Sequence, residues 1–155
     1  MGFALQDGGG DAYVLTNAAH LYWDKAREAA DEPSRSSEWQ RAVEYGEKAL
    51  QIDGGTLEGG YFLALAYKAQ GKIDKAVVLL SDLYRKYPTD VRLNMELGRM
   101  LASTKEPSRA VPYLQRVIAW DHGYARRQQA KNILIRPLTL YDGPQPRDYV
   151  PLEER

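Results

Sequence analysis

The sequence predicts an all-α fold built from a repeated pair of helices. The dipeptide Ala-Val occurs three times at a regular spacing of 34 residues, at Ala42-Val43, Ala76-Val77 and Ala110-Val111. Other small or apolar positions keep the same period, since Ala64 is followed by Gly98 and Leu80 by Leu114. A fixed period of this length is typical of helical repeat arrays, in which each unit buries its apolar face against its neighbours.

The first two helices are expected at residues 11–29 and 37–52. Ala19 and Ala42 look like the small positions of this first pair, but they are 23 residues apart. The corresponding positions of the later pairs are 12 residues apart, as in Ala64 and Ala76, so about 11 residues are inserted. Because the insertion is rich in Pro, Ser and Asp, we expect a lengthened first helix and a polar loop near 30–37.

Four further helices are expected, at residues 56–70, 73–87, 90–104 and 107–121. Thr56 and Asp90 can cap helix starts, because their side-chain oxygens accept hydrogen bonds from N–H groups of the first turn. Gly71 suits the left-handed turn after a helix end. Pro112 lies inside the last of these helices and predicts a bend there, since proline removes one backbone hydrogen bond.

A seventh helix is expected at about residues 123–135, apolar on one side and charged on the other, as a cap on the last repeat. Residues 136–155 contain four prolines and predict an extended tail. Apolar and aromatic side chains in this tail are expected to contact the solenoid or a partner, namely Leu138, Leu140, Tyr141, Tyr149 and Val150. Residues 1–10, with three consecutive glycines, predict a flexible leader.

The composition indicates one domain with tails. The chain has 155 residues, of which 44% are hydrophobic, and it contains no cysteine. It has no apolar run near 18 residues and no basic, hydrophobic start typical of a secretory signal, so neither a transmembrane segment nor a signal peptide is visible and the localisation is unknown.

No cofactor, metal site or catalytic residue is predicted. The only histidines, His20 and His122, are about a hundred residues apart, and no cysteine could complete a zinc site. The three leading glycines lack the preceding strand and the lysine of a phosphate-binding loop. Carboxylate pairs fall on polar helix faces, where nothing places them across a pocket as acid and base. The chain is therefore not expected to be an enzyme.

The charges are unevenly distributed although the formal net charge is zero. Residues 1–60 contain 5 basic and 11 acidic side chains, whereas residues 61–155 contain 16 and 10. In a solenoid the order along the chain is the order in space, so an acidic and a basic end are expected. Head-to-tail association is one consequence, and an incidental distribution of charge on solvated helices is the simpler interpretation. Overall neutrality argues against nucleic-acid binding.

These features resemble the tetratricopeptide repeat (TPR) family, whose unit is two antiparallel helices with small residues at their crossing and a proline near the end. The matching residues in repeat 57–90 are Leu63, Ala64, Tyr67, Ala76, Leu80 and Pro88, and those in repeat 91–124 are Leu97, Gly98, Leu101, Ala110 and Leu114. The resemblance implies a right-handed superhelical solenoid over residues 11–135, with about three helix pairs and a C-terminal cap.

The resemblance also implies a concave groove lined by the first helix of each repeat, through its second, fifth, ninth and twelfth positions. These positions hold Tyr13, Thr16, His20 and Trp23, then Glu58, Tyr61, Leu65 and Lys68, then Arg92, Met95, Arg99 and Ala102, with Arg126 and Gln129 from the cap. Such a groove would be aromatic at one end and cationic at the other, which suits a protein segment with apolar and acidic side chains. For Trp23 and Met95, packing within the solenoid is an equal alternative to contact with a ligand.

The sequence thus predicts a non-catalytic protein–protein interaction or scaffold module that binds a partner segment in its groove. One alternative is a structural or assembly subunit of a larger complex or homo-polymer, joined through the tail and the oppositely charged ends. A second alternative is a regulatory domain of a larger enzyme. The clamp with which some family members hold a C-terminal carboxylate is not reproduced, because its positions hold Thr16, His20, Phe62, Arg92 and Glu96.

Overall fold

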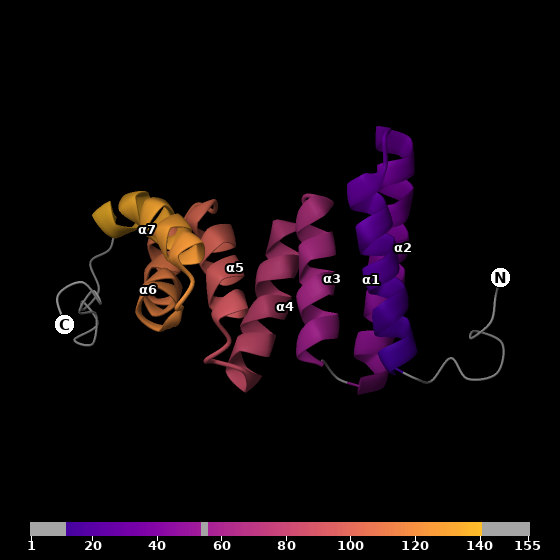
Figure 1. Cartoon of the computed structure of the whole chain (residues 1–155), viewed down its shortest axis with the longest axis horizontal. Coiled ribbons are helices and arrows are strands. Elements are labelled where there is room, and N and C mark those ends of the chain that lie inside the picture. Colours follow the sequence, from indigo (N-terminus) through magenta and orange to yellow (C-terminus); the bar gives the residue numbers. More distant parts are fainter. Residues whose placement is uncertain (1–11, 54–55, 141–155) are drawn as a thin grey trace. The chain divides into compact units, whose positions relative to one another are not determined.

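A computed structural model describes residues 12–53 and 56–140, which form helices and no β-strand (Figure 1). The helices are α1 (Ala12–Glu28), α2 (Glu32–Asp53), α3 (Leu57–Ala69), α4 (Ile73–Lys86), α5 (Val91–Ala102), the 3-10 helix η1 (Pro107–Ala110), α6 (Val111–Trp120) and α7 (Tyr124–Thr139). The predicted all-α helical repeat is confirmed. The expected leader and most of the expected tail lie outside the described residues.

The chain divides into two compact units, Met1–Leu83 and Tyr84–Arg155, with the boundary inside α4. In the first unit α1 packs along α2, and α3 contacts both of these helices. Ala64 and Ala76 are fully buried. A Cβ atom added to Gly60 would lie 2.7 Å from a methyl group of Leu83, so α3 and α4 approach too closely here for a larger residue.

In the second unit α5 packs against α6 and α7. Leu97, Leu114 and Val117 are completely buried in its core. A Cβ atom on Gly98 would lie 2.5 Å from a methyl carbon of Leu114, so the glycine is required by the close contact of α5 with α6. The small positions of the 34-residue period therefore lie where helices meet.

The predicted caps and turn are present. The Thr56 hydroxyl accepts a hydrogen bond from the Gly59 N–H at 3.2 Å, and an Asp90 carboxylate oxygen accepts one from the Leu93 N–H at 3.0 Å. Gly71 has a φ of 74°, the left-handed conformation expected after α3. The local sequence signals of the two regular repeats therefore set their helix ends.

The expected loop near 30–37 is shorter than predicted, because α2 begins at Glu32. Asp31 caps this helix, accepting hydrogen bonds from the Ser34 N–H and hydroxyl, each at 2.9 Å. Arg35 adds bonds to the Glu32 carboxylate and to the Ala29 carbonyl. Pro33 falls in the first helical turn, where its missing N–H is not needed. The insertion therefore lengthens α2 as well as α1.

The two proline-containing segments near the C-terminal end also differ from expectation. The segment expected as one helix at 107–121 consists of the 3-10 helix η1, which ends at Ala110, and of α6, which begins directly after it at Val111. Pro112 therefore falls in the first turn of α6, where its missing N–H is not needed. The seventh helix runs beyond residue 135 to Thr139, through Pro137. Ala130, Leu134 and Pro137 are buried along one side of α7, and this packing continues the helix. Leu138 consequently belongs to α7 and not to an extended tail.

Candidate functional site

The most distinctive surface of the first unit is an aromatic cluster, defined as His20 and Trp23 of α1 with Tyr61 and Phe62 of α3. The Phe62 ring centroid lies 4.2 Å from that of His20 and 5.5 Å from that of Trp23. Tyr61 meets Phe62 edge-on at 5.7 Å. All four residues are partly exposed, neither buried in the core nor fully solvated. The fold thus brings together three of the predicted groove residues.

Polar groups border this cluster. The His20 Nε2 atom lies 3.8 Å from the Asp24 carboxylate, and the His20 side chain is 45% exposed. The Arg27 guanidinium lies over the Trp23 ring, 4.7 Å from its centroid, in cation–π geometry. The ring of Trp39 stands edge-on to that of Trp23, with the two ring centroids 6.2 Å apart. Aromatic faces with a polar border are suited to hold an apolar side chain and to fix its orientation.

The other predicted groove residues of this unit are placed as follows. Thr16 faces α3, because its hydroxyl would lie 3.0 Å from a Cβ atom on Gly59. Leu65 and Lys68 are partly exposed, and Tyr13 is 72% exposed at the start of α1. Glu58 is exposed.

In the second unit, the predicted cationic residues have carboxylate partners of their own. Arg92 lies 3.4 Å from Asp90, and Arg126 lies 2.8 Å from Asp121. Arg99 lies 3.9 Å from Glu96 and also donates a hydrogen bond to the amide oxygen of Gln129, across from α5 to α7. The positive charge of this surface is therefore largely compensated within the unit, which the sequence pattern did not predict.

Met95 is a core residue, because it is only 4% exposed. Ala102 is partly exposed. Of the predicted tail contacts, Leu138 and Leu140 are 39% and 58% exposed. Tyr141, Tyr149 and Val150 lie outside the described residues.

The sequence reasoning missed Phe62, the centre of the aromatic cluster. Phe62 occupies a position of the family's carboxylate clamp, but it is not among the second, fifth, ninth and twelfth positions that predict the groove residues. The signal was the adjacent pair Tyr61-Phe62, since neighbouring residues on a helix are only about 100° apart and can share one broad surface. Asp121 was missed because an acidic residue after a helix gives no sign of the partners that bury it.

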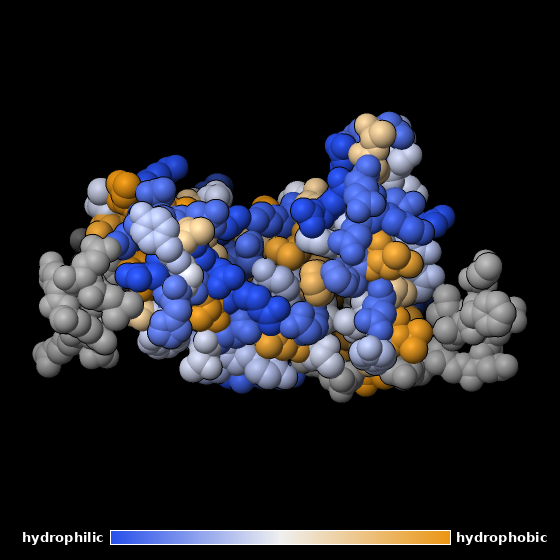
Figure 2. All heavy atoms as spheres, in the orientation of Figure 1, coloured by the Kyte–Doolittle hydropathy of each residue, from blue (hydrophilic) through white to orange (hydrophobic). Residues whose placement is uncertain are grey.

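Among residues 12–53 and 56–140, no three or more His, Cys, Asp or Glu side chains gather in a way that could hold a metal ion. The same part of the chain has no helix that is both long enough and apolar enough to cross a membrane. The visible face in Figure 2 is mostly hydrophilic, with hydrophobic residues in separate small patches.

Comparison with known proteins agrees with this architecture. Residues 67–134 match the family model described as tetratricopeptide repeat. This segment of the chain belongs to the tetratricopeptide repeat family. The TPR match includes the crossing positions Ala76, Gly98 and Ala110, which are all buried.

Curated relatives also resemble the chain. Lipopolysaccharide assembly protein B from three strains of Escherichia coli, K12 among them, is 32% identical over 91 residues. The alignment covers 56% of this chain and 23% of each relative, so the chain spans less than a quarter of the length of these proteins. TPR segments serve as surfaces for protein–protein interaction and scaffolding, because each stacked repeat presents side chains at a fixed spacing.

Proposed function

We propose that this TPR chain is a non-catalytic scaffold module that binds a segment of a partner protein against the first helices of its repeats. The aromatic cluster of α1 and α3 is the main contact. The observation that carries this proposal is the position of the Phe62 ring, which lies 4.2 Å from His20 and 5.5 Å from Trp23, with all three rings partly exposed. Partly exposed aromatic residues that support one another are typical of the energetic centre of a protein interface.

The proposed partner segment presents apolar side chains to the aromatic cluster. Acidic side chains would be of secondary importance, because Arg92, Arg99 and Arg126 already have carboxylate partners. An incoming carboxylate would have to replace Asp90, Glu96 or Asp121, and such exchanges between charge pairs bring little net affinity. We therefore expect charge to tune the choice of partner and the aromatic cluster to supply most of the binding energy.

The relatives support a role in assembly in general terms, since the name of the Escherichia coli protein states that it takes part in lipopolysaccharide assembly. The match covers only a small part of that protein, so its assembly partners are not transferred to this chain.

A phage-displayed library of random peptides tests the proposal. The library is selected on the whole chain, and isothermal titration calorimetry measures the enriched peptides. His20→Ala and Tyr61→Ala are expected to weaken binding at least about tenfold each, equal to about 1.4 kcal/mol. The matched control is Val78→Ala on α4, an apolar residue that is 62% exposed and does not belong to the cluster. Equal affinity for the cluster variants and the unaltered chain would overturn the proposal.

A further inference from the structure

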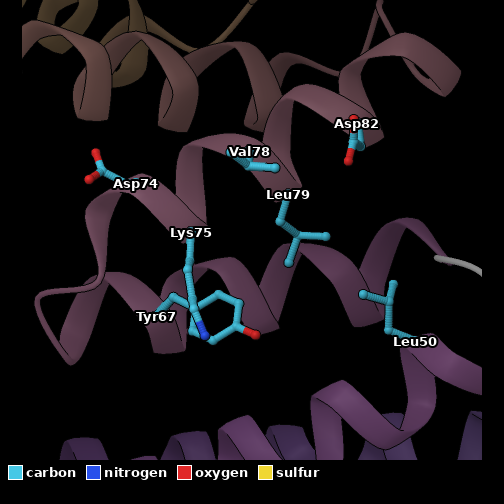
Figure 3. A pocket seen from close by; sticks show the side chains of 7 residues that line it. All are labelled: Leu50, Tyr67, Asp74, Lys75, Val78, Leu79 and Asp82. Carbon is cyan, nitrogen blue, oxygen red and sulfur yellow. The ribbon is translucent and has the colours of Figure 1, made fainter.

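A second surface of the first unit, independent of the aromatic cluster, is a groove between α2 and α4. It has a volume of about 440 Å³ and is lined by Leu50 of α2, Tyr67 of α3, and Val78 and Leu79 of α4, with Asp74, Lys75 and Asp82 at its edges. In Figure 3 the Leu50 side chain lies across from Leu79, and the Tyr67 ring lies at one end. Val78 is 62% exposed. This α2/α4 groove therefore offers an open apolar floor.

The edge of the α2/α4 groove carries more negative than positive charge. Asp74 and Asp82 are eight residues apart on α4, which corresponds to about 12 Å along the helix, and Figure 3 shows them toward opposite ends of the groove. The one basic side chain among the lining residues is Lys75, whose ammonium group lies over the Tyr67 ring, 5.5 Å from its centroid. An occupant that matches this edge has basic groups beside apolar side chains.

Helix α7 in the second unit has these properties. Its sequence contains Arg126, Arg127, Lys131 and Arg136 and no acidic residue. Tyr124 is 75% exposed, Ile135 is 68% exposed and Leu138 is 39% exposed. These three residues and Lys131 lie on one side of the helix by its 3.6-residue period. A terminal helix that only shields a solenoid has a polar outer side, so the exposed side of α7 is suited to bind another surface.

We propose that the exposed side of α7 binds in the α2/α4 groove of a second copy of this chain. Ile135 and Leu138 enter the apolar floor beside Val78 and Leu79, and the basic groups of α7 lie toward Asp74 and Asp82. The observation that favours a second copy is that one chain carries both an apolar surface edged mainly with acidic groups and a helix whose exposed apolar side adjoins Arg127 and Lys131 and whose sequence contains no acidic residue. Because the two surfaces differ, the contact is heterologous, and a pair of copies retains one unused groove and one unused α7 side for further copies.

Two variants of the whole chain test this pairing. Val78→Lys blocks the groove and Ile135→Asp blocks the α7 side, and both residues are more than half exposed, so the fold should tolerate the changes. Sedimentation velocity at low ionic strength is expected to show the unaltered chain growing in average mass with concentration. Each variant alone is expected to remain at the monomer mass of 17.5 kDa.

The decisive sample is an equimolar mixture of the two variants. The Ile135→Asp chain retains an intact groove and the Val78→Lys chain retains an intact α7, so the mixture should reach twice the monomer mass and grow no further. Leu21→Lys is the matched control, because Leu21 is 53% exposed and belongs to neither surface, and this variant should associate like the unaltered chain. Added salt should shift association to higher concentration.

Three results would overturn the proposal. The first is a monomeric unaltered chain at every concentration, and the second is a variant mixture that stays monomeric. The third concerns residues 141–155, which also contain acidic and apolar side chains. If the chain ending at Leu140 associates while the whole chain does not, the chain's own C-terminal segment covers α7. None of these results bears on peptide binding by the aromatic cluster.

Discussion

The hydroxyl group of Tyr67 donates a hydrogen bond to the carboxylate of Glu47 and so joins α3 to α2. Tyr67 is only 8% exposed, and the ammonium group of Lys75 lies over its ring. Burial raises the pKa of the Tyr67 hydroxyl well above its usual range, and the hydrogen bond to the Glu47 carboxylate raises the pKa further. One side chain thus connects the helices that border the α2/α4 groove.

Tyr67→Phe tests this link through the pH dependence of stability. Near pH 7 the change should lower the free energy of unfolding by about 1 kcal/mol, the usual contribution of one hydrogen bond. Above about pH 10 the unfolded chain loses the Tyr67 proton while the folded chain keeps it. The free energy of unfolding therefore falls by about 1.4 kcal/mol per pH unit. Between about pH 10 and 11, the free energy of unfolding of the unaltered chain should therefore fall more steeply than that of Tyr67→Phe.

Urea unfolding at a series of pH values measures this difference. Tyr124→Phe is the control, because Tyr124 is 75% exposed. Parallel curves for the unaltered chain and Tyr67→Phe would contradict the assigned hydrogen bond.

Gly98→Ala should destabilise the second unit by about 1–3 kcal/mol, because the added methyl group overpacks the contact of α5 with α6. Its Cβ would lie 2.5 Å from a Leu114 methyl carbon. The double variant Gly98→Ala/Leu114→Ala should lose less than the sum of the two single losses, since Leu114→Ala removes the obstructing atoms. Strict additivity in chemical denaturation would show that the two side chains do not compete for space.

Asp31→Ala should lower the melting temperature at pH 7, because the Ser34 N–H and hydroxyl lose their acceptor at the start of α2. These hydrogen bonds lower the pKa of the Asp31 carboxyl, that from the Ser34 N–H most. A carboxyl with a lowered folded-state pKa stabilises the fold above its unfolded pKa near 3.8, and this contribution is lost as the pH falls through the folded value. The difference between variant and unaltered chain should therefore shrink in acid.

Ser37→Ala is the matched control for Asp31. The insertion alone suggested a helix beginning at Ser37, whereas α2 begins at Glu32. If Ser37→Ala lowered the melting temperature as much as Asp31→Ala, the helix start would have to be moved to Ser37.

Asp121→Ala should cost about 2 kcal/mol of stability, because a largely buried carboxylate with charge-assisted hydrogen bonds is removed. Asp121 accepts a hydrogen bond from the Gly123 N–H and one from Arg126, each at 2.8 Å. Thermal unfolding monitored by circular dichroism measures the loss. His122→Ala provides the comparison, since His122 is exposed in the same loop, and it should unfold close to the unaltered chain.

The repeat register predicted the fold because small residues recur where helices must cross. Ala64, Ala76 and Gly98 are all buried at the positions that the 34-residue period gave them. The start of α2 is less predictable, because Pro33 is compatible both with a loop and with a first helical turn. The end of α7 was missed for a related reason, since burial of Pro137 outweighs its poor helix propensity.

The candidate site was predictable only in part. Register places His20, Trp23 and Tyr61 on the first helices, and the structure brings them together around Phe62. The repeat register does not predict which side chains form ion pairs with one another. These ion pairs determine the net charge of a surface. The sequence predicts Arg92 and Arg126 as cationic contacts, whereas in the structure Asp90 and Asp121 lie beside them.

The most direct test of the central claim is a nuclear magnetic resonance titration of the isotopically labelled chain with a peptide enriched from the phage library. The account predicts that the largest chemical-shift changes fall on the aromatic cluster, at His20, Trp23, Tyr61 and Phe62, and that His20→Ala reduces the changes at the other three residues at the same peptide concentration. Changes confined to α2 and α4 around Val78, with the aromatic cluster unaffected, would contradict it.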